Sequence, residues 1–567
     1  MLQQVKEKAP DIYAFLFQCY RSPSYLFFGN DIITSETGCQ QGDPCGPLLF
    51  SLSVQPIVES ITTEFNMWYL DDATLADSPT TVFENFEKLQ KSANNMGLKV
   101  NFNKCELYLG EDILNKEIVI QSFSSISPGI RIVSKSEFSL LGSPICEEGF
   151  LSFTSPKIEQ LKLMISRLTD VNAHTAYLLL KNCFMIPKLT YLLRTSPFWK
   201  FVGMMNSIDE LLHDSLQAIL NISLDKKQWN QATLPINNGG IGIRNVTDIA
   251  LPAFLSSAHG VSTLVSQVLH FLDQETPIHL VNEAKENWKQ INGDHLPEEL
   301  HVQKCWDIIN INRIVLEMQP ETSVDTARLK ALQEKESGAW LKAFPSKNIG
   351  TFMENRSFRA CMALRLGCKF VKKHKCECGI VVDENGIHGL NCTKSKGRFS
   401  RHSELNDIIH RSLASISIPS SLEPSGLSRD DGKRPDGMTL VPWSHGQSLV
   451  WDSTCVNTFA DTYLKYTKET AGYAAEEAAK RKMKKYITIT EQNYIFAPLS
   501  FETMGPWSSG TKKIVKKIGE KLTQLTGTTK SKSFLAQRLS LAIQRGNAAS
   551  VLGTLPTCVG MEEVFYC

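Results

Sequence analysis

Residues 65–76 read Phe65-Asn66-Met67-Trp68-Tyr69-Leu70-Asp71-Asp72-Ala73-Thr74-Leu75-Ala76. β-Prone residues lie on both sides of the two aspartates, so the stretch predicts two strands with Asp71 and Asp72 at the reversal. Two neighbouring carboxylates on a tight turn cannot both enter a core, and burying them without partners would be costly. A divalent cation such as Mg²⁺ would explain the pair, because hard oxygen ligands suit it. The motif alone is weak, and an acidic surface turn is the alternative.

Loop and helix signals precede this stretch. Residues 25–33 predict a hairpin with a Gly-Asn-Asp turn. The segment GCQQGDPCGPLLF (38–50) is a loop punctuated by Gly and Pro, and it leads into an expected helix over 47–59 that Pro56 should kink or end. Such a loop leaves backbone amides and a surface of small residues open to a ligand.

Further signals follow it. Residues 81–96 have the apolar spacing of an amphipathic helix, with Gly97 placed to end it. The segments GLKVNFNKCE (97–106) and FSLLG (138–142) come next.

Taken together and in order, these motifs resemble the reverse transcriptases of non-LTR retrotransposons. The resemblance implies that Gln41, Gly42, Asp43 and Pro44 handle template and nucleotide. It also implies that Asp71 and Asp72 hold catalytic Mg²⁺ (or Mn²⁺), that Lys104 belongs to the lysine-bearing motif, and that LLG (140–142) is a primer grip. RNA and DNA are the partners so implied.

Two-metal phosphoryl transfer needs carboxylates from two separate strands, because one hairpin cannot clamp both ions. In the family a further aspartate lies on an earlier strand, and this sequence begins too late to contain it. We therefore expect a partial palm, which argues against polymerase activity in this polypeptide.

A cluster of soft ligands lies near the middle of the C-terminal half. Cys376, Cys378, His388 and Cys392 fall within seventeen residues, among glycines that let the backbone wrap tightly. The set predicts a closed tetrahedral Zn²⁺ site of Cys₃His type, a zinc knuckle. Cys-x-Cys is tighter than the usual spacing, and reduced cysteines beside a free histidine are the alternative.

Three short segments and a helix follow the knuckle. RHSELN starts at residue 401, KRPDG at 433 and LVWDST at 449, and AAEEAAKRKMKKY (474–486) predicts a basic helix. Asp436 heads one strand-like run and Asp452 ends another. Two aspartates on neighbouring strands can converge on one metal ion, but a surface turn and a strand end would read the same.

This order resembles the restriction-like, PD-(D/E)xK endonuclease domain that follows the reverse transcriptase in site-specific non-LTR retrotransposons. The resemblance implies that Asp436 and Asp452 hold Mg²⁺, that Lys482 or Lys485 is the catalytic lysine, and that Glu404 is a helper carboxylate. It places Arg401, His402 and Arg434 at the nucleic acid. Thr454 departs from the pattern, since a lysine is expected two residues after Asp452.

Composition sets the remaining limits. Net charge is +1, yet residues 480–545 hold fourteen Lys and Arg against three acids, which suggests a DNA partner, with solvated helix faces as the alternative. Fifteen cysteines in 567 residues are too few for a disulfide scaffold. We expect neither a membrane span nor a secretory signal, because no apolar run approaches ~18–20 residues. A nuclear or cytoplasmic location follows.

The sequence thus predicts a multi-domain α+β protein. The expected parts are a partial right-hand palm with an antiparallel sheet and helices (1–150), an all-α thumb-like region (151–262), a helical linker (263–355), a zinc-knuckle region (356–400) and an α/β endonuclease-like domain (401–567). Metal-dependent DNA nicking is the expected activity. The alternatives are a catalytically inactive nucleic-acid-binding protein and a fragment of a longer retrotransposon polyprotein.

Overall fold

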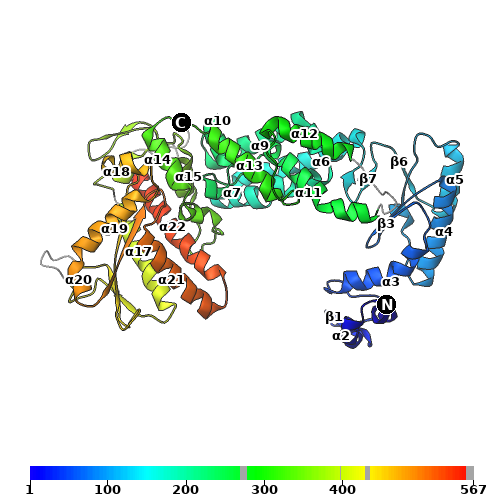
Figure 1. Ribbon diagram of the computed structural model, residues 1–567, viewed down its shortest axis with the longest axis horizontal. Helices are drawn as coiled ribbons and strands as arrows, with labels where there is room; N and C mark the ends of the chain where they lie inside the picture. The colour runs from blue at the N-terminus through cyan, green and yellow to red at the C-terminus, as the bar shows by residue number, and fades with distance from the viewer. Residues whose placement is uncertain (269–277, 396, 428–433, 557–567) are drawn as a thin grey trace. The chain divides into compact units, whose positions relative to one another are not determined.

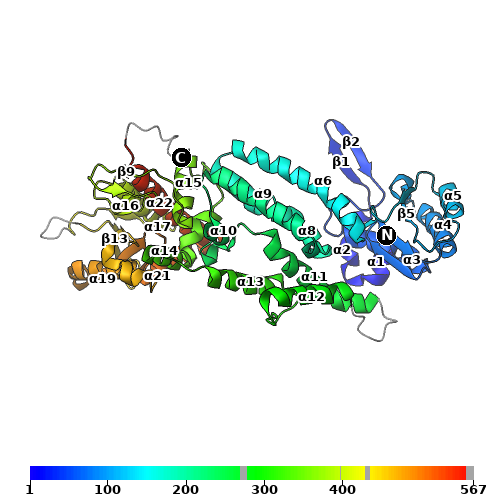
Figure 2. The same ribbon diagram turned by 90° about the horizontal axis from the view of Figure 1, so that it is seen from above.

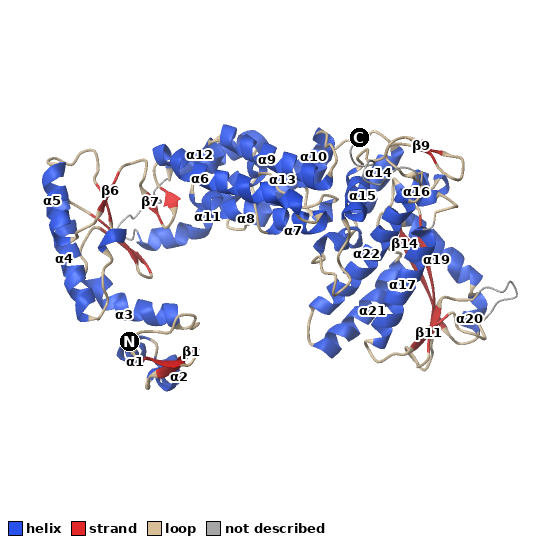
Figure 3. Cartoon of the chain, turned by 180° about the vertical axis from the view of Figure 1, so that it is seen from behind, coloured by secondary structure: helices blue, strands red, loops and turns tan. Residues whose placement is uncertain are grey.

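The computed structural model describes residues 1–268, 278–395, 397–427 and 434–556. The chain divides into two compact units, Met1–Pro156 and Lys157–Cys567. Helices dominate both units and the described strands form small sheets, so the protein is α+β (Figure 3).

The first unit consists of helices and short strands that pair two by two. Its elements are α1 (Leu2–Lys8), α2 (Pro10–Tyr20), β1 (Ser24–Phe28), β2 (Asp31–Ser35), α3 (Gly46–Ser60), β3 (Phe65–Tyr69), β4 (Asp72–Ala76), α4 (Pro79–Asn95), η1 (Phe102–Lys104), β5 (Glu106–Tyr108), α5 (Lys116–Ile126), β6 (Arg131–Val133), β7 (Ser139–Leu140) and β8 (Ser143–Pro144). Helix α6 (Glu147–Ser166) runs from this unit into the second.

The hairpin of β3 and β4 rests on a small core from α3 and α4. Ile57 of α3, Ile61 just after that helix and Leu89 of α4 are buried there, and the half-buried Trp68 packs against them. Ser78 caps α4 by accepting a hydrogen bond from the backbone N–H of Thr81. The helix pair therefore fixes the base of the hairpin that carries the two aspartates.

The expected antiparallel palm sheet is not continuous in the described part of this unit. The β1–β2 and β3–β4 hairpins each stand alone, and β5 pairs with β6 in parallel. The β1–β2 hairpin leaves apolar side chains exposed on its faces, Phe27 and Phe28 most of all.

The first part of the second unit is helical (Figure 2). Its helices are η2 (Arg167–Asp170), α7 (Ala173–Asn182), α8 (Ile186–Thr195), η3 (Phe198–Lys200), α9 (Val202–Leu220), α10 (Lys226–Thr233), η4 (Ile236–Asn238), α11 (Val246–Val268), α12 (His279–Asn292), α13 (Gln303–Glu317), α14 (Ser323–Leu332), η5 (Lys335–Lys342) and α15 (Asn355–Leu366).

Helix α11 lies at the centre of this helical region, in contact with α8, α9, α12 and α13. It alone among the described helices is long and apolar enough to cross a membrane by length and composition, although no uninterrupted apolar run signals it in the sequence. Of its most apolar window, 44% is buried inside the protein. The core helix of a soluble protein passes the same test, so the observation is weak evidence for a span.

The second part of this unit contains the knuckle region and the largest described sheet. Its elements are β9 (His374–Lys375), β10 (Val381–Val382), α16 (His388–Asn391), α17 (Gly397–Ala414), β11 (Ser420–Leu422), β12 (Gly437–Thr439), β13 (Leu449–Val456), α18 (Asp461–Thr467), α19 (Tyr473–Lys485), α20 (Ile487–Glu491), β14 (Ile495–Glu502), α21 (Ser509–Thr526) and α22 (Lys530–Leu552).

The sheet has the order β11-β12-β13-β14 and is covered by helices on both faces (Figure 1). Strands β11, β12 and β13 run antiparallel, whereas β14 runs parallel to β13. Alternate residues of β13 enter different cores, as strand geometry requires: Trp451 packs with α17, α21 and α22, and Val450 packs with Tyr486 and α20.

Helix α22 joins this sheet to the helical region. It contacts α15 and η5 on one side and α17 and α21 on the other. The backbone N–H of Trp340 donates to Ser540 Oγ at 3.3 Å, and the Cys361 thiol donates to the Gln544 carbonyl at 3.2 Å. The sheet and part of the helical region therefore share one core within this unit.

Candidate functional site: two carboxylate sites and a cysteine–histidine cluster

Asp71 and Asp72 lie at the tip of the β3–β4 hairpin, as the sequence predicts. Tyr69 pairs with Asp72, which leaves Leu70 and Asp71 as the two-residue turn. Leu70 has a φ of 54°, the positive value that such tight hairpin turns need. Both carboxylates are exposed, and neither forms a salt bridge with another described residue. Their oxygens are thus free to take a cation.

The loop at residues 38–45 is held by Asp43 rather than left open around it. Asp43 accepts a hydrogen bond from the Tyr20 hydroxyl and another from the backbone N–H of Cys45 at 2.8 Å. These two bonds lower the pKa of Asp43, the Tyr20 bond most. Gly42 has a φ of 91°, which favours glycine at the turn. Gln41 and Pro44 remain exposed.

Lys104 ends the short helix η1 and is exposed. Among the described residues it forms no ion pair with Asp71 or Asp72. Three or more His, Cys, Asp or Glu side chains close enough to share one metal ion occur in one place among the described residues, the cysteine–histidine cluster. The β3–β4 hairpin therefore has no such group of metal ligands. The first unit presents two adjacent carboxylates without a third partner.

Cys376, Cys378, His388 and Cys392 converge on one point. Their ligand atoms all lie within 4.8 Å of one another. Cys376 Sγ is 3.7 Å from Cys392 Sγ, and Cys378 Sγ is 3.2 Å from His388 Nε2. In a tetrahedral site with Zn–S bonds of about 2.3 Å, neighbouring sulfurs lie about 3.8 Å apart, so this donor set fits zinc.

The local backbone explains how the four ligands meet. Gly379 turns the chain with a φ of 91° between β9 and β10, and the backbone N–H of Cys376 donates to the Ile380 carbonyl at 2.9 Å. His388 begins α16 and Cys392 follows it. A Cβ at Gly389 would come within 2.7 Å of Val551 Cα, so the knuckle packs closely on α22.

Asp436 and Asp452 flank the same rung of the C-terminal sheet. Gly437 is paired with Trp451, so Asp436 precedes this pair on one strand and Asp452 follows it on the next. The backbone N–H of Ser453 donates to Asp436 Oδ2 at 2.6 Å. Gly437 is required here, because a Cβ would meet the Trp451 ring at 2.1 Å.

Asp452 lies within β13 rather than at its end, which corrects the sequence-based prediction. The strand continues to Val456 because β14 pairs with it residue by residue as far as Glu502. The Asp452 side chain is only 4% exposed. Thr454, two residues further along β13 where a lysine is expected, supplies no cation.

Both lysines that the sequence points to on α19 face Asp452. Lys482 Nζ donates to Asp452 Oδ1, and Lys485 Nζ lies 4.0 Å from Asp452 Oδ2. The two lysines are three residues apart on one helix face. Tyr486 donates its hydroxyl hydrogen to the Arg434 carbonyl at 3.0 Å, which ties α19 to the chain just before Asp436.

His402 reaches the other aspartate. Its Nε2 lies 3.0 Å from Asp436 Oδ2. The hydrogen bond to Asp436 raises the pKa of His402 although burial opposes it. Burial acts to raise the pKa of Asp436, but the bond and charge of His402, with the Ser453 N–H, lower it overall. The sequence predicts His402 at the nucleic acid, and in the structure its imidazole lies against a carboxylate that it can orient.

Asn406 belongs to this group and was not predicted. Its Oδ1 accepts from Ser453 Oγ at 2.7 Å and from Trp451 Nε1 at 3.1 Å. It lies four residues after His402 on α17, and this spacing on one helix face is the signal that could have found it.

Two predicted site residues have other partners. Glu404 pairs with Arg545 of α22 at 2.9 Å, so it is not brought to the aspartates. Arg401 is buried and donates to Asn547 Oδ1 at 2.7 Å, which makes it a structural residue and withdraws its side chain from nucleic acid. Arg434 is exposed at the rim, as a nucleic-acid contact requires.

Glu502 is a further buried carboxylate that the sequence did not single out. It ends β14, and its Oε1 accepts from the backbone N–H of Ala475 at 3.2 Å, in the first turn of α19. Burial raises its pKa to about 7. The Ala475 N–H favours the charged form, but burial outweighs it, so the hydrogen bond ties β14 to the helix that carries Lys482 and Lys485 while ionisation of Glu502 stays unfavourable.

Residues 4–145 match the family "Reverse transcriptase (RNA-dependent DNA polymerase)". The match covers about a quarter of the chain and lies within the first unit. It relates this segment to reverse transcriptases, a family that normally uses Mg²⁺ and binds nucleic acids. A comparison with curated proteins found no match.

Proposed function

We propose that the C-terminal sheet of this protein cleaves one strand of DNA with the help of Mg²⁺ or Mn²⁺. The observation that carries the proposal is the placement of Asp436, just before β12, next to Asp452 of β13, while Lys482 of α19 donates to Asp452. Buried carboxylates beside a lysine are the groups that hold a divalent cation and handle an attacking water.

Each residue has a role in this proposal. The carboxylates of Asp436 and Asp452 hold the metal ion, which supplies charge neutralisation at the scissile phosphate. Lys482 orients the attacking water and Lys485 supports the charge of Asp452. His402 and Asn406 keep Asp436 and Ser453 in place, and Arg434 lies where a phosphate can reach it.

A plasmid-nicking assay tests the proposal. The wild-type chain with Mg²⁺ or Mn²⁺ should convert supercoiled plasmid to open circles, and Asp436→Ala should not. Asp407→Ala is the matched control, because Asp407 is partly exposed and, among the described residues, pairs with Arg411 on its own helix rather than with the aspartates. Equal nicking by the wild-type chain and Asp436→Ala would contradict the proposal.

For the segment that matches reverse transcriptases, we propose nucleic-acid binding rather than catalysis. We propose that residues 4–145 bind RNA and DNA, as a domain of the non-LTR type would, without synthesising DNA, because Asp71 and Asp72 lie on one hairpin and no described strand pairs with that hairpin to bring a further carboxylate. Primer extension on an RNA template should give no cDNA. Robust synthesis would show that a further carboxylate completes the site.

A catalytically inactive nucleic-acid-binding protein and a part of a longer retrotransposon polyprotein remain the alternatives. For the Cys₃His cluster we propose a structural Zn²⁺ site, because its four donors leave no open position. In either alternative this site and the basic helices would serve binding alone.

A further inference from the structure

Phe399 lies in the first turn of α17 and is the most exposed aromatic side chain among the described Phe, Tyr and Trp residues. It is 81% exposed, although burying a phenylalanine is favourable and α17 packs against α22, β11 and β13. Single exposed apolar side chains are common on protein surfaces, so the place of the ring decides whether it has a role.

The ring lies on the face of α17 that carries the site residues. Asn406 accepts a hydrogen bond from Ser453 of β13, and four residues earlier His402 Nε2 lies 3.0 Å from Asp436 Oδ2. Phe399 comes three residues before His402, which puts it on the same face about one turn further along. Asn406 is buried and Phe399 is not, so the helix has passed the edge of the sheet at this point. The ring therefore lies beside the carboxylate site rather than over the core.

Exposed cations accompany the ring. Lys394 and Arg398 precede it in the chain, Arg434 lies two residues before Asp436, and none of the three forms an ion pair with a described residue. Burial raises the pKa of the Cys455 thiol and the charge of Arg398 opposes that rise, so Arg398 lies close to β13 as well. DNA, the polyanion of the proposed function, complements these charges and brings bases to the ring.

A phenyl ring has no hydrogen-bonding group, so it recognises DNA through apolar contact with sugars or with the faces of bases. In a paired duplex the base faces are covered by stacking, and a ring reaches them only by wedging into a base step at the cost of unstacking it. An unpaired base stacks on an aromatic side chain without that cost. A ring in this position therefore favours DNA that is opened near the carboxylate site.

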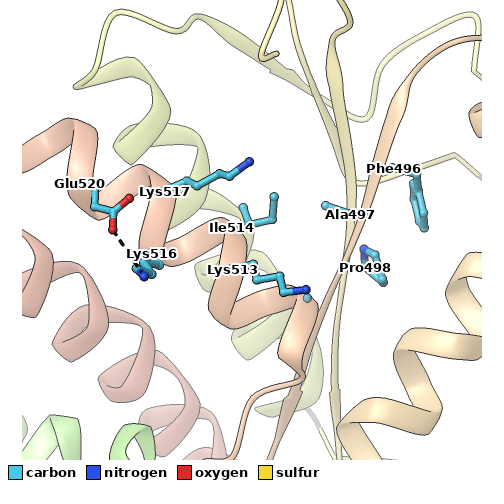
Figure 4. Close-up of a pocket in the computed structure, with 9 residues that line it drawn as sticks. Phe496, Ala497, Pro498, Lys513, Ile514, Lys516, Lys517 and Glu520 are labelled. Carbon is cyan, nitrogen blue, oxygen red and sulfur yellow. Dashed lines mark ion pairs between the residues drawn. The ribbon is translucent and has the colours of Figure 1, made fainter. Parts of the chain in front are cut away.

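The lysine-lined hollow of the same unit offers no such ring. It lies between β14 and α21 and measures about 430 Å³, and Lys513 and Lys517 extend from α21 toward β14 (Figure 4). Phe496 contributes to its lining but is buried, because it packs with Val450 and Tyr486 in the core on the other face of the sheet. A base can therefore meet an exposed ring at Phe399 and not in this hollow.

We infer that Phe399 stacks on a base next to the phosphate on which the carboxylate site acts, and so selects DNA that is locally unpaired there. The ring contacts the substrate and positions the phosphate over Asp436 and Asp452 without taking part in bond breaking. DNA as the partner rests on the proposed function, whereas the base contact and the preference for opened DNA are new to it.

Fluorescence anisotropy with two labelled duplexes tests this inference. The duplexes share their end sequences, and one is fully paired while the other has a short unpaired bubble at its centre. The full chain is used without divalent metal, so binding is measured apart from cleavage. The wild type should bind the bubble duplex about tenfold more tightly than the paired one. Phe399→Ala should bind both with the wild-type affinity for the paired duplex, and Phe399→Trp should keep the preference.

The control removes the same ring elsewhere in the same unit. Phe344 is 66% exposed, and Phe344→Ala should keep the preference for the bubble. Equal affinity of the wild type for the two duplexes would overturn the inference, as would an unchanged preference in Phe399→Ala. Dimerisation of the wild type that Phe399→Ala abolishes would assign the ring to a second copy of the chain and would also overturn it.

The two proposals fail separately in these assays. Asp436→Ala should lose nicking and keep the preference for the bubble. A chain that never nicks plasmid but prefers the bubble through Phe399 would end the nuclease proposal and support the base contact. Nicking that depends on Asp436, together with a preference that does not depend on Phe399, would support the nuclease and overturn the base contact.

Discussion

At the residue scale, the pair of Lys482 and Asp452 has a structural role besides the chemical role that we propose for it. The Asp452 side chain is 4% exposed and that of Lys482 is 23% exposed, so the carboxylate depends on the lysine for its charge balance. Removing one partner of such a pair leaves an uncompensated charge, which costs more than the pair itself contributes.

A double-mutant cycle separates the two roles. Lys482→Ala should lower the free energy of unfolding by about 1–3 kcal/mol, and adding Asp452→Asn should restore part of it because the unpaired charge is gone. Nicking should be lost in Lys482→Ala, in Asp452→Asn and in the double variant. Chemical denaturation and the plasmid assay measure the two effects, and Lys480→Ala, whose lysine pairs with Glu477 on the outside of α19, is the control. Wild-type nicking by the double variant would leave Lys482 with a structural role only.

Gly437 makes a second prediction at this scale. A Cβ at this position would lie 2.1 Å from the ring of Trp451, which is fully buried. Gly437→Ala should therefore cost on the order of 3 kcal/mol of stability, as overpacking does, and should reduce nicking because Asp436 is the preceding residue. Gly203→Ala is the control, since a Cβ there meets no atom within 4 Å. Equal thermal stability of the two variants would show that the sheet accommodates the methyl group.

At the element scale, Glu502 couples β14 to α19. Its folded-state pKa of about 7 lies above the ordinary value of 4.5. Between pH 4.5 and 7 the unfolded chain binds fewer protons at this group than the folded chain, so stability falls as pH rises and the loss is complete above pH 7. The total is on the order of 3 kcal/mol.

Glu502→Gln should remove this pH dependence. The amide keeps an oxygen for the Ala475 N–H and carries no charge, so the variant should be more stable than the wild type at pH 8 and similar to it at pH 4.5. Urea unfolding at several pH values measures the difference, and Glu520→Gln on the exposed face of α21 should behave as the wild type. Parallel pH profiles for wild type and Glu502→Gln would contradict the coupling.

Sequence patterns predict elements whose causes are local. The β3–β4 turn at Asp71, the helix ended at Gly97 and the basic helix α19 follow from alternation, capping and periodicity within a few residues. The Cys₃His cluster also forms within one short stretch, and the structure brings its four donors together as predicted.

What the sequence could not predict depends on partners far along the chain. Glu404 pairs with Arg545 of α22, 141 residues later, rather than with the aspartates. Arg401 is buried and donates a hydrogen bond to Asn547, which also lies on α22. The extension of β13 beyond Asp452 needs β14, and Asn406 is identified only once α17 lies on β13. Local propensity carries no information on these long-range pairings.

At the scale of the whole molecule, the two compact units hold different kinds of site. The first presents the carboxylates of Asp71 and Asp72, and the second holds the Cys₃His cluster and the C-terminal sheet. The described cysteines are free thiols, so metal binding rather than a disulfide is what could close the knuckle.

Zinc removal should therefore act on one unit. The knuckle packs on α22 at Gly389, and His374 Nε2 lies 3.0 Å from Thr554 Oγ1 just after that helix, so losing the metal should loosen the knuckle and the end of α22. We expect one zinc per chain in the wild type and none in Cys392→Ser, while Cys183→Ser, at an exposed cysteine, should keep the metal.

After chelation, amide hydrogen exchange should rise in residues 374–392 and in the last turns of α22, because structural zinc contributes folding free energy directly. Helix α4 in the first unit should keep its protection, since it packs within its own core. If the zinc-free wild-type chain kept full protection from amide hydrogen exchange over residues 374–392, hydrogen bonds and packing alone would hold this segment in place.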